Sequence, residues 1–179
     1  MNLLENLPKR KRQRLENYDY SQNGAYFVTI CVANGDPILS RLSVGTVALD
    51  CPQPKDVKIQ LTQIGRIAEK YIKSIERSYE YVFVEKYVIM PEHIHMLIVI
   101  DVPYGASRAM HPTLSQIVSS FKRLVVKEYG QKIWQRGFYD KIIRTQKGFE
   151  TAWYYIEFNP LNRIQNKQNK SKESKNENQ

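Results

Sequence analysis

The sequence lacks the features that mark several classes of protein. Its 179 residues include only two cysteines, Cys31 and Cys51, which are too few for a disulfide framework or a cysteine-based zinc site. No apolar run approaches the roughly 18 residues of a membrane-spanning helix, and the first residues lack the basic-then-apolar order of a secretory signal. We therefore expect a cytoplasmic protein with no membrane association, of a length that suits one domain.

Acidic charge is also scarce, because 27 Lys and Arg residues outnumber 18 Asp and Glu residues and leave a net charge of +9. Residues 108–147 alone carry nine cations and two acids. Five more cations gather near the start of the chain: Lys9, Arg10, Lys11, Arg12 and Arg14. Clustered positive charge favours a polyanion by counterion release, whereas evenly spread lysine favours only solubility. Charge therefore indicates a nucleic-acid partner.

The chain divides into three parts by composition. Residues 1–17 form a basic N-terminal arm, in which Pro8 and the basic run argue against a stable helix. Residues 18–160 form a compact unit. Residues 161–179 form a basic tail that holds one apolar residue after position 161, Ile164. We expect this tail to be disordered, because it cannot bury enough apolar surface to offset its ordering entropy.

Within the compact unit, strands and helices alternate. Runs of β-branched and aromatic residues predict strands at 26–32, 82–90, 93–100 and around 141–144. Apolar residues at helical spacing predict helices at 61–77, at 114–125 with a cap at Gly130, and at 149–156 with a stop before Pro160. Residues 36–58 predict a long loop with room for a small hairpin. This order predicts an α+β fold, a ferredoxin-like sandwich of a mostly antiparallel sheet with helices packed on it.

Two of the three histidines stand together in the most apolar stretch of the chain. His93 and His95 flank Ile94 directly after the Pro91-Glu92 turn. Strand alternation places both imidazoles on one face, close enough to share one cation. A lone His-x-His is also common as a structural or surface feature, but two imidazoles in apolar surroundings are costly unless something binds them. Glu92 is a turn residue or a partner for one of the histidines.

The last predicted helix carries a second pair of polar groups. Tyr155 and Asn159 are four residues apart, so they lie about 40° apart around the helix and face the same way. Spacing alone leaves a second interpretation open, in which Tyr155 is an amphipathic packing residue and Asn159 only caps the helix before Pro160. Tyr154 lies about 100° from Tyr155 around the helix and does not share a face with Asn159.

Several motifs, taken in order, resemble the REP-associated tyrosine transposases. This group contains an IS200-like transposase domain and belongs to the HUH single-strand transposase superfamily, named for two histidines around a bulky apolar residue. The matching segments are Tyr18-Asp19-Tyr20 with residues 24–29, residues 88–95, Phe121-Lys122, residues 133–140 with Ile143-Arg144, and residues 155–160. The resemblance covers residues 18 to 160, which it implies are the catalytic domain.

The resemblance implies a role for each of four residues. His93 and His95 are expected to bind a metal, Asn159 to supply an oxygen ligand, and Tyr155 to be the nucleophile. Mg²⁺ or Mn²⁺ suits these donors, although zinc is not excluded by ligand type. Tyrosine suits reversible strand transfer, because a phenol with a pKa near 10 leaves more readily than a sugar alkoxide. The implied enzyme is a metal-dependent transposase that cleaves single-stranded DNA and rejoins it.

The expected substrate is single-stranded DNA with a hairpin, of the REP-like palindromic type, and no obligate protein partner is implied. On the helix at 114–125 the face opposite the apolar stripe offers hydroxyls and cations that suit a phosphate backbone. Aromatic residues near 134–139 suit stacking of unpaired bases, although Trp134 equally suits the core. The predicted DNA-binding residues are Lys9, Arg10, Lys11, Arg12, Arg14, Arg123, Lys127, Trp134, Arg136, Lys141 and Arg144.

Two other functions compete with this one. A host-retained descendant of a transposase would bind hairpin DNA without processing it, but such a protein has no use for all four of His93, His95, Tyr155 and Asn159. A metal-dependent hydrolase of small phosphoesters would not need the basic arm, the basic central stretch and the basic tail. We therefore expect a catalytic transposase, with a monomer preferred over a dimer.

Overall fold

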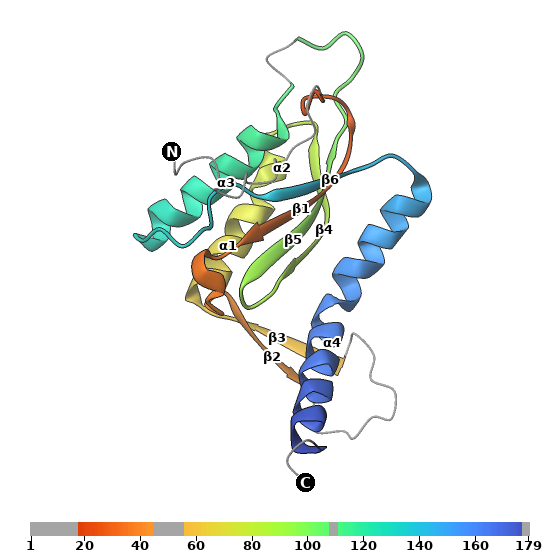
Figure 1. Cartoon of the computed structure of the whole chain (residues 1–179). Coiled ribbons are helices and arrows are strands. Elements are labelled where there is room, and N and C mark those ends of the chain that lie inside the picture. The colour runs from red at the N-terminus through yellow and green to blue at the C-terminus, as the bar shows by residue number, and fades with distance from the viewer. Residues whose placement is uncertain (1–17, 45–55, 108–110, 177–179) are drawn as a thin grey trace, which may run out of the picture.

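The computed structural model describes residues 18–44, 56–107 and 111–176, with side chains through residue 166. The predicted arm with Lys9, Arg10, Lys11, Arg12 and Arg14 lies outside the described residues. The elements are β1 (Gly24–Cys31), the 3-10 turn η1 (Ala33–Gly35), β2 (Ser40–Val44), β3 (Val57–Leu61), α1 (Gln63–Lys73), α2 (Ile75–Ser78), β4 (Val82–Ile89), β5 (His93–Ile100), α3 (Leu114–Tyr129), β6 (Tyr139–Ile143) and α4 (Gln146–Asn176) (Figure 1).

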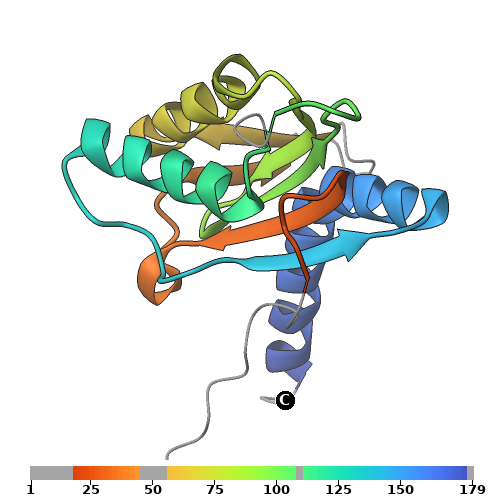
Figure 2. The same ribbon diagram turned by 90° about the horizontal axis from the view of Figure 1, so that it is seen from above.

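The main sheet has four strands in the order β4-β5-β1-β6, and every neighbouring pair is antiparallel. Figure 2 shows α1 and α3 on one side of this sheet and α4 on the other. The arrangement confirms the predicted α+β sandwich. A separate two-stranded sheet joins β2 and β3, so the segment predicted as a long loop does contain a hairpin. The tip of this hairpin, residues 45–55, lies outside the described residues.

Alternation along β1 assigns each side chain to one of two apolar layers. Tyr26, Val28 and Ile30 are fully buried and belong to the large core under α1 and α3. Phe27 points the other way and packs in a smaller cluster with Ala152 and Ile156 of α4. Strand geometry requires this separation, because successive side chains project to opposite faces of a sheet. The sheet is therefore covered by apolar contacts on both faces.

The ends of α3 follow local sequence signals. Thr113 forms a capping box with Gln116, in which each side chain bonds to the other residue's backbone N–H. Gly130 ends the helix with φ of 86°, a left-handed conformation that glycine adopts without steric cost. This confirms the predicted cap. The predicted helix at 61–77, in contrast, is divided at Ser74 into α1 and the short α2.

The last helix departs from its prediction. It does not stop before Pro160 but continues to Asn176, so residues 161–176, expected to be a disordered tail, are helical. Pro160 removes one helical hydrogen bond, and Figure 1 shows α4 changing direction along its length. Tertiary contacts beyond the proline compensate for this loss, because Pro160 and Leu161 are buried and Arg163 forms an ion pair with Glu92.

No helix among the described residues is long and apolar enough to cross a membrane.

Gly65 allows α1 to pack closely against the backbone at Leu39, and this close packing can be tested. The Thr62 side chain caps the helix by accepting from the Gly65 N–H, and a Cβ on Gly65 would overlap the Leu39 carbonyl oxygen. We expect Gly65→Ala to lower the free energy of unfolding by about 1–3 kcal/mol, because the overlapping atom belongs to the backbone and not to a flexible side chain. Urea unfolding measures the change. Gln63→Ala, an exposed change in the same helical turn, is the control and should stay within about 0.5 kcal/mol of the wild type.

Candidate active site

The turn between β4 and β5 positions both histidines. Its backbone is held by the Met90 N–H, which donates to the His93 carbonyl, and by the Val32 N–H, which donates to the Glu92 carbonyl, both at 2.9 Å. From there β5 alternates, so that Ile94 enters the large core while His93 and His95 face α4. The two imidazole rings lie 4.5 Å apart between centroids. The expectation that both rings share one face is confirmed.

His95 is held in a fixed orientation by β1. Thr29 lies directly opposite His95 in the antiparallel register, and its hydroxyl is 2.9 Å from His95 Nδ1. The Phe27 ring packs 5.0 Å away, and only 5% of the histidine is exposed. Because Nδ1 is engaged by Thr29, the Nε2 edge of the ring is the one presented for a ligand.

Burial controls the charge of the two imidazoles. It lowers the pKa of His95 to about 3, and the charge of His93 adds to the effect. Burial also lowers the pKa of His93, against the opposing influence of Glu92. Desolvation disfavours the charged form of histidine, so both rings are neutral near pH 7. Neutral imidazole is the form that binds metal ions.

Helix α4 brings the other two predicted residues to the histidines. The Tyr155 ring lies 5.3 Å from His95 and 5.6 Å from Phe27, in edge-on contacts, and remains 48% exposed. The Asn159 side chain lies beside His93, where it favours the charged form of the imidazole and so raises the pKa of His93 against the larger effect of burial. Tyr154, at 62% exposed, projects about 100° away around the helix. The structure thus assembles His93, His95, Tyr155 and Asn159 in one place from two elements.

The donor set at this place fits a divalent metal. Among the described residues there is no group of three or more His, Cys, Asp and Glu side chains that would hold a metal ion, so an ion here depends on the Asn159 oxygen beside the two imidazoles. Glu92 adds an acidic group, with Oε1 3.6 Å from His93 Nδ1 and Oε2 buried without a hydrogen-bond partner. Two neutral nitrogens and one oxygen leave coordination positions open for phosphate oxygens.

A family model described as "Transposase IS200 like" matches residues 55–159. The chain belongs to this family. All four assembled residues lie within the match. The solved structure of a REP-associated tyrosine transposase bound to a REP hairpin has the same fold, with a TM-score of 0.58 and 20% sequence identity, over 84% of this chain and 74% of that one. An uncharacterized protein of Haemophilus influenzae is 27% identical over 172 residues, which cover 85% of this chain and 88% of that one.

One contact in this IS200-like transposase was missed by sequence reasoning. Arg163 of α4 donates to Glu92, with Nη2 2.7 Å from Oε1. The residue lies beyond Pro160, in the segment expected to be disordered. Its spacing of four residues from Asn159 is the signal that would have placed it on the face that carries Tyr155 and Asn159.

A cleft of about 510 Å³ opens beside Tyr155, between β6 and the first turns of α4. Phe27, Ile143 and Ala152 form its apolar wall. Lys141, which was predicted to bind DNA, lies at this cleft together with Lys147, which was not predicted. Both lysines belong to the strongly basic stretch of residues 108–147, and the charge of this stretch is the sequence signal that could have identified Lys147.

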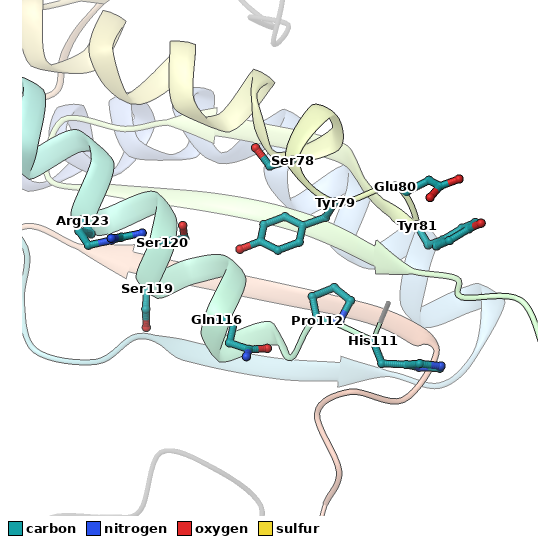
Figure 3. Close-up of a pocket in the computed structure, with 10 residues that line it drawn as sticks. All are labelled: Ser78, Tyr79, Glu80, Tyr81, His111, Pro112, Gln116, Ser119, Ser120 and Arg123. Atoms are coloured by element: carbon teal, nitrogen blue, oxygen red, sulfur yellow. The ribbon is translucent and has the colours of Figure 1, made fainter. Parts of the chain in front are cut away.

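A second groove, of about 700 Å³, lies across the sheet from the histidines, where α3 meets the turn that leads into β4. Figure 3 shows that Ser119, Ser120 and Arg123 of α3 line it, and that Tyr79 reaches in from the opposite wall. This is the α3 face predicted to meet a phosphate backbone. Lys127 is exposed one turn farther along the helix.

The remaining predicted DNA contacts differ in placement. Arg136 and Arg144 are exposed. Trp134 is partly buried, packs 5.8 Å from the Phe121 ring and bridges to Val32, so its position favours the core alternative over base stacking.

The backbone on both sides of Arg136 is held by hydrogen bonds from Lys122 of α3. Lys122 Nζ donates to the carbonyls of Gln135 and Gly137 at 2.7 Å each. Burial lowers the pKa of Lys122.

The low pKa of His95 predicts a pH-dependent stability of the metal-free protein. Below about pH 6.5 an unfolded histidine takes up a proton, whereas folded His95 stays neutral down to about pH 3. The unfolded state then binds more protons, so the free energy of unfolding should fall as the pH drops through this window. Urea unfolding in EDTA at pH 7 and pH 5 measures the loss. His95→Asn should reduce it, and an unchanged loss in that variant would contradict the assignment.

Proposed function

We propose that this protein is a metal-dependent transposase that binds hairpin DNA, cleaves the adjoining single strand through Tyr155 and rejoins strands. The observation that carries the proposal is that helix α4 places one residue against each of the two histidines. Tyr155 packs on His95 while Asn159 lies beside His93. A module that only binds DNA has no need to place a half-exposed phenol beside two neutral imidazoles.

Each residue has a defined task in this reaction. His93, His95 and Asn159 would hold Mg²⁺ or Mn²⁺, which supplies positive charge to the phosphate when bound. The Tyr155 oxygen forms a bond to phosphorus, and the 3′ oxygen leaves with the bonding electrons and takes a proton to become a free 3′-OH. The 5′ phosphate of the cleaved DNA strand is then bonded to Tyr155 as a 5′-phosphotyrosine. Attack of a 3′-OH on that link reverses the step, because the phenolate is a good leaving group.

The surroundings of Tyr155 suit an unpaired DNA strand. The cleft beside it offers an apolar wall with Lys141 and Lys147, so bases and phosphates both find matching groups. The groove at α3, with Arg123 and two serines, suits the backbone of a duplex stem. The related transposase of known structure was solved with a REP hairpin bound, which supports a hairpin as the substrate class.

The metal assignment is tested by removing a histidine. We expect His93→Ala to abolish cleavage of a labelled single-stranded hairpin, because one of three ligands is lost, while hairpin affinity in a gel-shift assay stays near the wild-type value. His111→Ala removes a histidine across the sheet from the site, at the groove proposed for the duplex stem, so it is compared at saturating hairpin, where it should still cleave. Wild-type cleavage that persists undiminished in EDTA would disprove the metal.

The nucleophile is tested by removing one oxygen. Tyr155→Phe keeps the ring that packs on His95 and Phe27, so we expect little loss of stability and normal DNA binding, but no covalent adduct and no free 3′-OH product. Tyr154→Phe is the matched control and should retain the adduct. Trapping the wild-type adduct, digesting it and mapping the modified peptide by mass spectrometry identifies the attacker. DNA attached at Tyr154, or cleavage by Tyr155→Phe, would overturn the assignment.

A further inference from the structure

Three residues on one face of α4 meet three neighbouring side chains of the β4–β5 turn and β5. Tyr155, Asn159 and Arg163 follow one another at intervals of four, so they form a single row along the helix. Tyr155 contacts His95, Asn159 lies beside His93, and Arg163 pairs with Glu92. The third contact thus continues the row formed by the proposed nucleophile and the proposed oxygen ligand.

Arg163 binds a part of the fold that is itself held in place. The Glu92 carbonyl accepts from Val32 at the end of β1, and the neighbouring Pro91 carbonyl accepts from Leu39. The Glu92 side chain is 17% exposed and lies against His93. A charge-assisted bond from Arg163 to this carboxylate therefore fixes the far half of α4 to the turn that carries the first histidine.

The position of Pro160 in α4 explains why the helix needs the contact of Arg163 with Glu92. Pro160 lies between Asn159 and Arg163 and removes a helical hydrogen bond directly after the proposed oxygen ligand. Before the proline, α4 is held to the edge strand β4 by Lys86, which pairs with Glu157 and lies over the Trp153 ring. Beyond the proline, within the described side chains up to residue 166, the pair of Arg163 with Glu92 is the charged contact between the helix and the turn that carries His93.

We propose that Arg163 and Glu92 form a positioning pair that holds the row of α4 in register with the histidines, so that Asn159 stays on the metal and Tyr155 stays on the phosphate. This inference rests on the proposed function. Arg163 lies outside the residues that the family model matches, 55–159. Neither residue of the pair is assigned to the reacting atoms. Its effect passes through His93 and Asn159, and partners that orient metal ligands typically change metal affinity by about 10–100-fold.

The test measures Mn²⁺ binding by calorimetry to the full chain without DNA. We expect Arg163→Met, which keeps most of the aliphatic stem, to weaken Mn²⁺ binding by about tenfold or more and to slow cleavage at saturating hairpin, with hairpin affinity unchanged. Arg163→Lys restores a cation that reaches Glu92 and should recover most of both losses. A role in folding alone would not separate metal affinity from hairpin affinity in this way.

Glu157→Gln is the matched control, because it removes the ion pair between α4 and Lys86 of β4 without touching Glu92 or His93. It should leave Mn²⁺ affinity near the wild-type value. Equal losses of Mn²⁺ affinity in both variants would overturn the positioning role in favour of general docking of the helix. Loss of hairpin affinity alone in Arg163→Met would make Arg163 a DNA contact instead. Wild-type Mn²⁺ affinity in Arg163→Met disproves the pair, whereas absence of Mn²⁺ binding by the wild type disproves the proposed function.

Discussion

The pairing of β1 with β5 determines where every group of the site lies. Its register places Thr29 opposite His95 and Cys31 opposite His93, so a shift of one residue would turn both imidazoles into the core and bring Ile94 to the α4 face. The core resists such a shift, because Tyr26, Val28 and Ile30 on β1 and Ile94, Met96 and Ile98 on β5 are all fully buried on the opposite face. Apolar packing on one side of the sheet thereby maintains the chemistry on the other.

Helix α4 reaches the histidines through a small apolar contact and several polar ones. Ala152 and Ile156 pack on Phe27, Val88 and Leu97, which leaves the adjacent helix face available for Tyr155 and Asn159. The helix has a low share of apolar residues and a proline in its interior, so its position depends on charged contacts at two points. This division leaves Tyr155 half-exposed beside the histidines, whereas a fully apolar helix face would bury it.

Periodic patterns in the sequence predicted the strands of the sheet, the helices α1 and α3 that cover one of its faces, and the shared face of His93 and His95. These features depend on the spacing of side chains along a single strand or helix, which is a local property of the sequence. The extension of α4 past Pro160 could not be predicted, because composition indicated disorder and the pair of Arg163 with Glu92 joins residues far apart in the chain. The core position of Trp134 was likewise undecided, since its partners Phe121 and Val32 come from other elements. Long-range contacts of single residues leave no periodic signal.

The internal hydrogen bonds of Lys122 have a consequence for the energetics of DNA binding. This cation sits within the basic stretch, and two of the three N–H donors of its ammonium group bond to backbone carbonyls of the chain itself. These bonds fix the loop around Arg136 in advance, so a ligand bound there would cost less conformational entropy than it would in a free loop. A gain of this kind does not depend on ionic strength, whereas attraction between exposed cations and a polyanion does.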